Sequence, residues 1–226
     1  MSTTLTIVVI AILSYIVGSF PTATFISRRF FGYDIREKGS GNMGSTNAFR
    51  ILGWKWGLAV QLIDITKGLI AVLLVANILG KGLAFHNITY FENITLIRIM
   101  AGIFAVLGHI FSVFVNFKGG KGINTAAGML FAIAPVDFGV CAFVFTLAVG
   151  MSGYISLGSI LSAMVLPASL IIRHNIFGIE IPGYLTLVYF FIALCILIVY
   201  THRENVKRLL KGNENRFNKL RFIKFK

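Results

Sequence analysis

The chain has 226 residues, of which 57% are apolar, and carries a formal net charge of +13. A mean hydropathy of +0.84 exceeds what the core of a soluble domain can bury, so the composition indicates an all-α, polytopic membrane protein with no soluble domain left over. The basic residues lie at the edges of apolar stretches and in the tail. This placement argues against nucleic-acid binding and favours anionic lipids and an anionic substrate as partners.

Six apolar stretches follow one another along the chain, over residues 5–26, 56–79, 96–117, 123–151, 155–172 and 184–200. The first is too long for the core of a signal peptide and lacks a basic segment before it, so we expect a retained membrane span. The fourth would reach about 43 Å as one helix, beyond the roughly 30 Å of a bilayer core. Because Pro135 and Asp137 interrupt it, we predict two short helices in its place.

Lysine and arginine residues predict the orientation of the chain. Six lie in residues 28–55 and nine in the tail over residues 203–226, and Lys118 and Lys121 fall on the same side. By the positive-inside rule the N-terminus is outside and the basic tail is cytoplasmic. Seven transmembrane helices, two of them short, satisfy this orientation. Five crossings with a re-entrant pair of helices are the alternative.

The first polar island is GSGNMGSTNAFR, over residues 39–50. Its closely spaced glycines indicate a tight loop, and Ser45, Thr46 and Asn47 offer N-cap chemistry for a short helix that ends near Arg50. Helix N-termini attract anions, so a phosphate site is one interpretation. A glycine-rich cytoplasmic turn with ordinary capping explains the segment as well.

The second polar island, FKGGKG over residues 117–122, opens the next helix. We expect the backbone N–H groups of Gly119 to Gly122 and the Lys121 ammonium to converge on a phosphate there. The spacing differs from that of a P-loop and no strand precedes it, so a nucleotide is not implied. A tight basic turn between two spans is the alternative.

The third polar island is HREN, over residues 202–205 at the end of the last apolar stretch. His202 and Asn205 lie one helical turn apart and can point at one ligand, whereas Glu204 is expected to pair with a nearby cation. Polar anchoring at the membrane interface is the alternative for His202. In the predicted topology all three islands and Ser156 share the cytoplasmic face.

Asp64 and Lys67 lie three residues apart in the second apolar stretch. Each is costly in lipid, so we expect both to face protein and to form a structural ion pair. His109 also falls within an apolar stretch, where it packs or lines a cavity. The two cysteines form no metal-ligand spacing, so neither a metal nor a cofactor is expected.

Together these segments resemble one family, the bacterial acyl-phosphate:glycerol-3-phosphate acyltransferases (PlsY), which are integral membrane enzymes of phosphatidic acid synthesis. The resemblance covers nearly the whole chain. It runs in the family's order through GSFPT (18–22), DIR (34–36), GSGNMGSTN (39–47) with Arg50, DITKG (64–68), GHI (108–110), FKGGKG (117–122), YISL (154–157) and HREN (202–205). The outer loops differ.

The resemblance implies acyl transfer from a fatty acyl phosphate to the sn-1 hydroxyl of glycerol 3-phosphate. The products are lysophosphatidic acid and phosphate, in the first step of phospholipid synthesis. It further implies a single membrane acyltransferase domain over residues 1–226, a monomer in the plasma membrane with its active site on the cytoplasmic face. The expected partners are the two substrates and membrane lipids, with no nucleic acid.

The same resemblance assigns the site residues. Those with a catalytic role are Ser40, Lys121, His202 and Asn205. Those that bind substrate are Asn42, Thr46, Asn47, Arg50, Gly119, Gly120 and Ser156. In this assignment Arg50 and Lys121 hold glycerol 3-phosphate, while the Gly119 turn and Asn205 hold the acyl phosphate and stabilise the developing oxyanion.

The sequence does not identify the general base. None of the four histidines precedes an aspartate at the H-x-x-x-x-D spacing of coenzyme-A-dependent acyltransferases. His202 can accept the proton, or the departing phosphate can, and the resemblance favours the phosphate. A membrane transporter for a phosphate-bearing anion is the alternative function. It is disfavoured because the islands lie at one face instead of the midplane and no inverted repeat is apparent.

Overall fold

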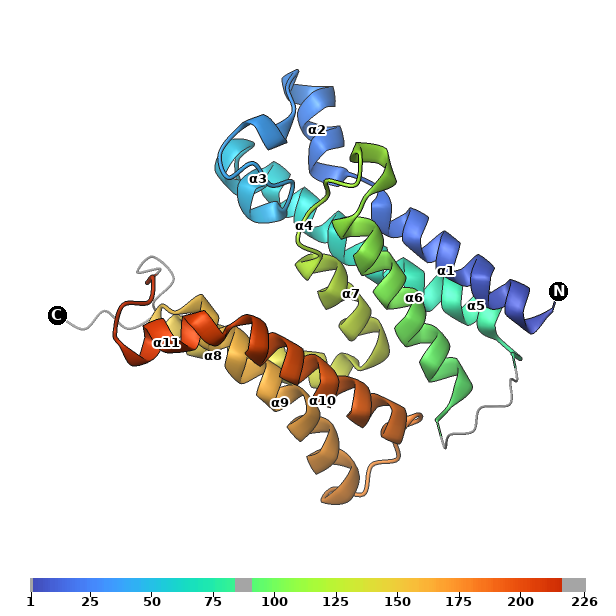
Figure 1. The fold of residues 1–226 in the computed structure, drawn as a ribbon. Helices are drawn as coiled ribbons and strands as arrows, with labels where there is room; N and C mark the ends of the chain where they lie inside the picture. Colours follow the sequence, from blue (N-terminus) through green and yellow to red (C-terminus); the bar gives the residue numbers. More distant parts are fainter. Residues whose placement is uncertain (1, 84–90, 217–226) are drawn as a thin grey trace. The chain divides into compact units, whose positions relative to one another are not determined.

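The computed structural model describes residues 2–83 and 91–216, and the regular secondary structure in these residues is helical throughout (Figure 1). The all-α class predicted from composition is therefore confirmed. The chain divides into two compact units, unit 1 over Met1–Thr89 and Asn93–Ile133 and unit 2 over Tyr90–Glu92 and Ala134–Lys226. The single domain expected over residues 1–226 stays a prediction.

Unit 1 is a bundle in which α1 packs along α6 and α4 packs along α7 (Figure 1). Its helical segments are α1 (Thr3–Ser19), α2 (Thr22–Phe31), η1 (Ile35–Glu37), α3 (Ser45–Ile51), α4 (Trp54–Leu69), η2 (Ile70–Ala76), α5 (Asn77–Gly80), α6 (Asn93–Ile110), η3 (Val113–Val115) and α7 (Ile123–Ile133). The segment η2 is π-helical and continues α4 directly.

Unit 2 is a smaller bundle in which α9 packs against both α8 and α10. Its helices are α8 (Pro135–Ser152), α9 (Ile155–Asn175), α10 (Tyr184–Thr201) and α11 (Arg203–Leu210). The basic tail predicted over residues 203–226 begins with α11, and its last part, residues 217–226, lies outside the described residues.

Six segments of the described chain are long and apolar enough to cross a membrane: Thr3–Phe31, Trp54–Gly80, Asn93–Val115, Pro135–Ser152, Ile155–Asn175 and Tyr184–Thr201. The predicted break before Pro135 is confirmed, because α7 ends at Ile133 and α8 begins with Pro135 as its first residue. Two short helices were predicted on either side of this break, but of these two only α7 is short. Its 11 residues reach about 17 Å, whereas α8 has 18 residues. Seven crossings and the orientation of the termini stay predictions.

The first apolar stretch bends where the sequence suggested one continuous span. Phe20 and Pro21 separate α1 from α2. Proline lacks an N–H and disfavours helical geometry in the residue before it, so the helix ends there. The carbonyl oxygen of Phe20 instead accepts a hydrogen bond from Lys67 of α4.

Close backbone contact joins the short helix α7 to α4. A Cβ atom at Gly68 would lie 2.2 Å from the carbonyl oxygen of Thr125, and one at Gly128 would lie 1.9 Å from that of Ile65. Glycine therefore allows the two backbones to touch from both sides.

Candidate active site

Asn47 organises the loop that precedes α3. Its side chain is 2% exposed, and its Nδ2 donates to the carbonyl oxygens of Lys38 and Asn42 at 3.0 and 2.9 Å. Its Oδ1 accepts from the backbone N–H of Ser40 at 3.0 Å. The amide thus closes the loop on itself, which holds the exposed Ser40 in place.

The short helix predicted near residues 45–50 is confirmed as α3, but its expected cap is wrong. The N-cap is Gly44, without a side-chain cap, and the Gly44 N–H donates to Oδ1 of Asn42 at 2.8 Å. Thr46 and Arg50 are exposed, whereas Asn47 is turned into the loop. Asn47 and Arg50 therefore do not present one shared face to solvent.

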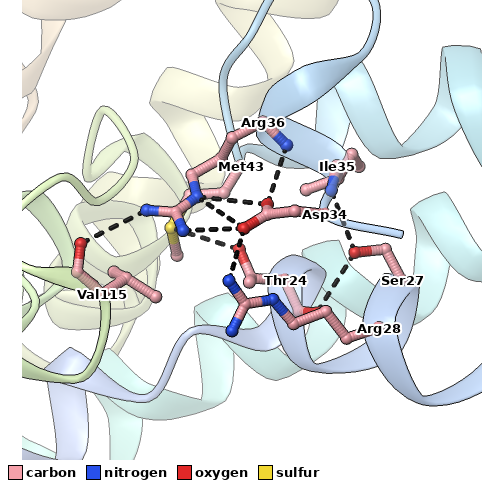
Figure 2. Close-up of polar contacts among 8 residues, drawn as sticks. All are labelled: Thr24, Ser27, Arg28, Asp34, Ile35, Arg36, Met43 and Val115. Carbon is pink, nitrogen blue, oxygen red and sulfur yellow. Dashed lines mark hydrogen bonds and ion pairs between the residues drawn. The ribbon is translucent and has the colours of Figure 1, made fainter. Parts of the chain in front are cut away.

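A buried carboxylate, Asp34, holds two arginines at the start of the same loop (Figure 2). Arg28 donates to Asp34 Oδ2 at 2.8 Å, and Arg36 donates to the same oxygen at 2.7 Å. The second terminal nitrogen of Arg36 reaches the carbonyl oxygen of Val115 at 3.2 Å, as Figure 2 shows. Asp34 thereby aims Arg36 at the segment that leads to Lys118.

This pairing shifts both titration equilibria. The hydrogen bond from Arg36 lowers the pKa of Asp34 well below its ordinary value, and the bonds from the Arg36 backbone and from Arg28 lower it further. The same contact raises the pKa of Arg36. Asp34 is therefore ionised at neutral pH, and its charge is compensated by the two guanidinium groups.

The glycine turn after η3 differs from the predicted phosphate cradle. The N–H of Gly119 donates to the carbonyl oxygen of Ile110, and that of Gly120 to the carbonyl oxygen of His109, each at 3.0 Å. These two amides satisfy the last carbonyl groups of α6 instead of pointing at an anion. The Lys121 side chain, which was also expected to donate to a phosphate, is exposed to solvent.

Asn116 and Phe117, directly before this turn, adopt left-handed backbone conformations with φ of 55° and 57°. For a bulky residue such as Phe117 this conformation costs roughly 1–2 kcal/mol. The surrounding contacts therefore hold the approach to the turn in an unusual shape.

Two hydrogen bonds show that the first and second polar islands lie at the same end of unit 1. Besides the contact between Arg36 and Val115, Nδ2 of Asn124 in α7 donates to Oγ of Ser45 in α3 at 2.9 Å. A hollow of about 440 Å³ opens beside the first contact. Its lining residues are Asp34, Arg36, Glu37, Gly41, Val115, Asn116, Lys118 and Gly119.

In unit 2 the predicted site residues Ser156 and Asn205 share one partner, Glu214. Ser156 Oγ and Asn205 Nδ2 each donate to Oε1 of Glu214 at 2.8 Å, and Arg208 Nε donates to Oε2 at 2.7 Å. The hydrogen bond from Asn205, followed by those from Arg208 and Ser156, lowers the pKa of Glu214. The carboxylate thus connects α9 and α11 to the segment that follows α11.

His202 stands at the junction of α10 and α11, where it ends one helix and caps the next. Its Nδ1 lies 2.9 Å from the carbonyl oxygen of Ile198. A carbonyl oxygen only accepts, so this contact assigns the proton of the neutral ring to Nδ1 and leaves the lone pair on Nε2. Glu204 pairs with Lys207 at 2.9 Å, as predicted.

Sequence reasoning gave no site role to Asp34, Arg36 or Glu214. Asp34 and Arg36 belong to a segment, DIR, whose match to the family was visible, but their pairing depends on the fold of the loop. Glu214 lies in a polar tail with no periodic pattern around it, so no sequence signal marked it.

Comparisons with known proteins agree with the helical fold. The family model described as "Glycerol-3-phosphate acyltransferase" matches residues 8–212. A glycerol-3-phosphate acyltransferase of Chlorobium chlorochromatii (strain CaD3) is 43% identical over 233 residues, which cover 95% of this chain and 98% of that protein.

Two crystal structures of PlsY, described as an integral membrane glycerol 3-phosphate acyltransferase, match with a TM-score of 0.69. The glycerol 3-phosphate form is 33% identical and the lysophosphatidic acid form 31%, and each match covers 95% of this chain and 96% of the solved chain. Sequence and fold thus place the chain among integral membrane acyltransferases. The chain belongs to the glycerol-3-phosphate acyltransferase family.

Proposed function

We propose that this enzyme takes its acyl group from a fatty acyl phosphate and transfers it to the sn-1 hydroxyl of glycerol 3-phosphate. Lysophosphatidic acid and inorganic phosphate are the products. One observation carries the proposal. The first polar island, residues 39–50, and the glycine turn, residues 118–122, lie together at one end of unit 1. That end presents the exposed cations Arg50, Lys118 and Lys121.

The chemistry asked of the protein is modest. An acyl phosphate is a mixed anhydride and is already activated toward attack by an alcohol. The enzyme mainly needs to bind two phosphate-bearing substrates and orient the hydroxyl. Holding reactants in the reactive geometry accelerates a reaction strongly. The hydroxyl oxygen forms the new ester bond, the carbon–oxygen bond to phosphate breaks, and the hydroxyl proton leaves with phosphate or through a base.

In unit 1 we assign the acceptor phosphate to Arg50 and Lys121. A guanidinium group offers two parallel N–H donors to phosphate oxygens, and a lysine ammonium adds a mobile positive charge. Ser40 in the loop and Thr46 in α3 are exposed, and their hydroxyl groups can donate to this substrate. Asn42 and Asn47 act on the substrate indirectly, because their side-chain amides shape the loop.

In unit 2 we assign Asn205 to the acyl phosphate, and Ser156 acts through Glu214, to which it gives its only hydroxyl proton. Glu214 orients both side chains through Oε1. An amide nitrogen carries two hydrogens, so Asn205 keeps a second donor for the oxygen on which charge develops.

We assign the proton to the departing phosphate, with His202 as an orienting group. The lone pair on Nε2 gives His202 the capacity to accept a hydrogen bond from the substrate hydroxyl. The positive charge of residues 28–55 and of the tail supports a site on the cytoplasmic face of the plasma membrane, and we propose a monomer.

The donor is tested by direct competition. Detergent-purified protein is given radiolabelled glycerol 3-phosphate with palmitoyl phosphate, palmitoyl coenzyme A or palmitoyl carrier protein. Lysophosphatidate should form with palmitoyl phosphate and not with the two thioesters. Product from a thioester at a similar rate would refute the acyl-phosphate assignment. Uptake of glycerol 3-phosphate by sealed vesicles without product would favour the transporter.

A further inference from the structure

A buried cluster of charged and polar side chains lies within unit 1, directly behind the glycine turn. Asp64 Oδ1 accepts from Lys67 Nζ at 2.6 Å and from Thr22 Oγ1 at 2.8 Å. Lys67 also donates to the carbonyl oxygen of Phe20 at 2.5 Å. The predicted ion pair is therefore confirmed, and it fixes the bend between α1 and α2 to α4.

His109 of α6 completes this cluster. Its side chain is 3% exposed, and its Nδ1 lies 3.8 Å from Asp64 Oδ1, which is too long for a hydrogen bond. Within the described residues Nδ1 has no hydrogen-bond partner. Burying a nitrogen without a hydrogen-bond partner is costly, so the position of the ring calls for an explanation in its packing.

The other side of the ring supports Gly120. A Cβ atom at Gly120 would lie 2.2 Å from Nε2 of His109, and the next two nearest atoms also belong to the imidazole. The Gly120 N–H in addition donates to the carbonyl oxygen of His109 at 3.0 Å. Gly120 therefore packs directly against the imidazole of His109, and no side chain fits between them. Its N–H also binds the His109 backbone.

Lys121 follows Gly120 directly, so the position of the ring determines where the turn places the Lys121 backbone. We infer that His109 is a positioning residue for the acceptor substrate. Its imidazole, which lies beside Asp64 of the buried ion pair, supports the turn and thereby places Lys121. This inference rests on the role of Lys121 under the proposed function.

A double-mutant cycle tests the contact. Gly120→Ala places a methyl group against the ring, so it should lower kcat/KM for glycerol 3-phosphate by at least tenfold. Adding His109→Ala removes the ring and the clash, so the double variant should recover to the kcat/KM of His109→Ala alone. A Gly120→Ala enzyme with wild-type kinetics, or a double variant without recovery, would overturn the inference.

Gly119→Ala is the matched control. A Cβ atom at Gly119 would lie 2.0 and 2.7 Å from the carbonyl oxygens of His109 and Ile110, which are backbone atoms that His109→Ala retains. His109→Ala should therefore not rescue Gly119→Ala. Equal rescue of both glycine variants would mean that the ring acts only on general stability, against the inference.

Single substitutions at His109 keep the test decisive if a glycine variant does not fold. His109→Ala should raise KM for glycerol 3-phosphate more than it lowers kcat. His109→Gln keeps an atom near the position of Nε2 and can still support the turn, so its KM for glycerol 3-phosphate should stay near that of the wild type. Because glutamine cannot exchange a proton at neutral pH, this result would also separate support of the turn from proton transfer. Wild-type kinetics in His109→Ala would contradict the inference, and so would equal loss in both variants.

Two further measurements separate this inference from the proposed function. If the wild type uses only a thioester donor, the donor assignment fails and the same variants are compared with that donor. If Lys121→Ala leaves KM for glycerol 3-phosphate unchanged, the role of Lys121 fails. The recovery of kcat in the double variant would then still report whether the ring supports the turn.

Discussion

The guanidinium of Arg36 donates a hydrogen bond to the carbonyl oxygen of Val115 at 3.2 Å while its other edge is held by Asp34. One side chain thus connects the loop of the first polar island to the segment before the glycine turn. Arginine suits this position because its planar group donates in two directions at once, which a lysine ammonium on a flexible stem does not reproduce.

Arg36→Lys should therefore loosen the connection between the two loops although the charge is kept. Loss of a hydrogen bond made by a charged group costs roughly 1.5–3 kcal/mol, so we expect kcat/KM to fall at least about tenfold. Steady-state kinetics of detergent-purified protein measure it. Arg29→Lys, an exposed arginine at the end of α2, is the matched control and should change little. Equal kinetics in the two variants would show that the connection has no effect on the reaction.

Arg50→Ala should raise KM for glycerol 3-phosphate by roughly ten- to a hundredfold and leave KM for the acyl phosphate nearly unchanged. The reason is that a guanidinium contact to phosphate contributes roughly 1.5–3 kcal/mol and, in our assignment, is made to one substrate only. Varying each substrate in turn at saturation of the other separates the two constants. A similar rise in both would remove the assignment.

Glu214→Gln should lower the melting temperature at neutral pH, because the carboxylate accepts hydrogen bonds from Ser156, Asn205 and Arg208. Its pKa is lowered from the ordinary value of 4.5. A carboxyl group of this kind stabilises the folded state fully above pH 4.5, and the contribution is lost as the pH falls through the lowered pKa. The difference between variant and wild type should therefore narrow in acid.

Glu204→Gln is the control for that measurement, since Glu204 forms an exposed pair with Lys207. Pairs of this kind contribute little to stability, so its melting temperature should match that of the wild type. A Glu214→Gln protein that melts with the wild type at neutral pH would remove the structural role of this carboxylate.

His202→Gln tests which group takes the proton. If the departing phosphate is the base, the variant should fold, saturate with both substrates and retain turnover within about 10²-fold of the wild type. A true general base contributes up to about 10⁴-fold. Single-turnover rates across pH measure the effect. A loss beyond about 10⁴-fold would move the role to His202.

Local patterns in the sequence predicted several features correctly, including the helix near residues 45–50, the break before Pro135 and the pairing of Asp64 with Lys67. Each depends on residues that are close along the chain or on the length of an apolar stretch. The bend at Pro21 was missed, because a stretch that is apolar on both sides of a proline reads as continuous.

The finer arrangement of the site depends on partners far apart along the chain. The amide of Asn47 was expected to face a ligand, but the loop backbone surrounds it. The amides of Gly119 and Gly120 were expected to face an anion, but the end of α6 lies within reach. Whether such a donor binds a ligand or the backbone depends on three-dimensional packing, which cannot be predicted from the spacing of residues along the chain.

The reciprocal glycine contacts of α7 with α4 prevent the short helix from sliding along its neighbour. Because α7 begins two residues after Lys121, this fixed register also determines where the lysine stands relative to α4. A larger residue at either glycine would displace α7 along α4 and would move Lys121 with it.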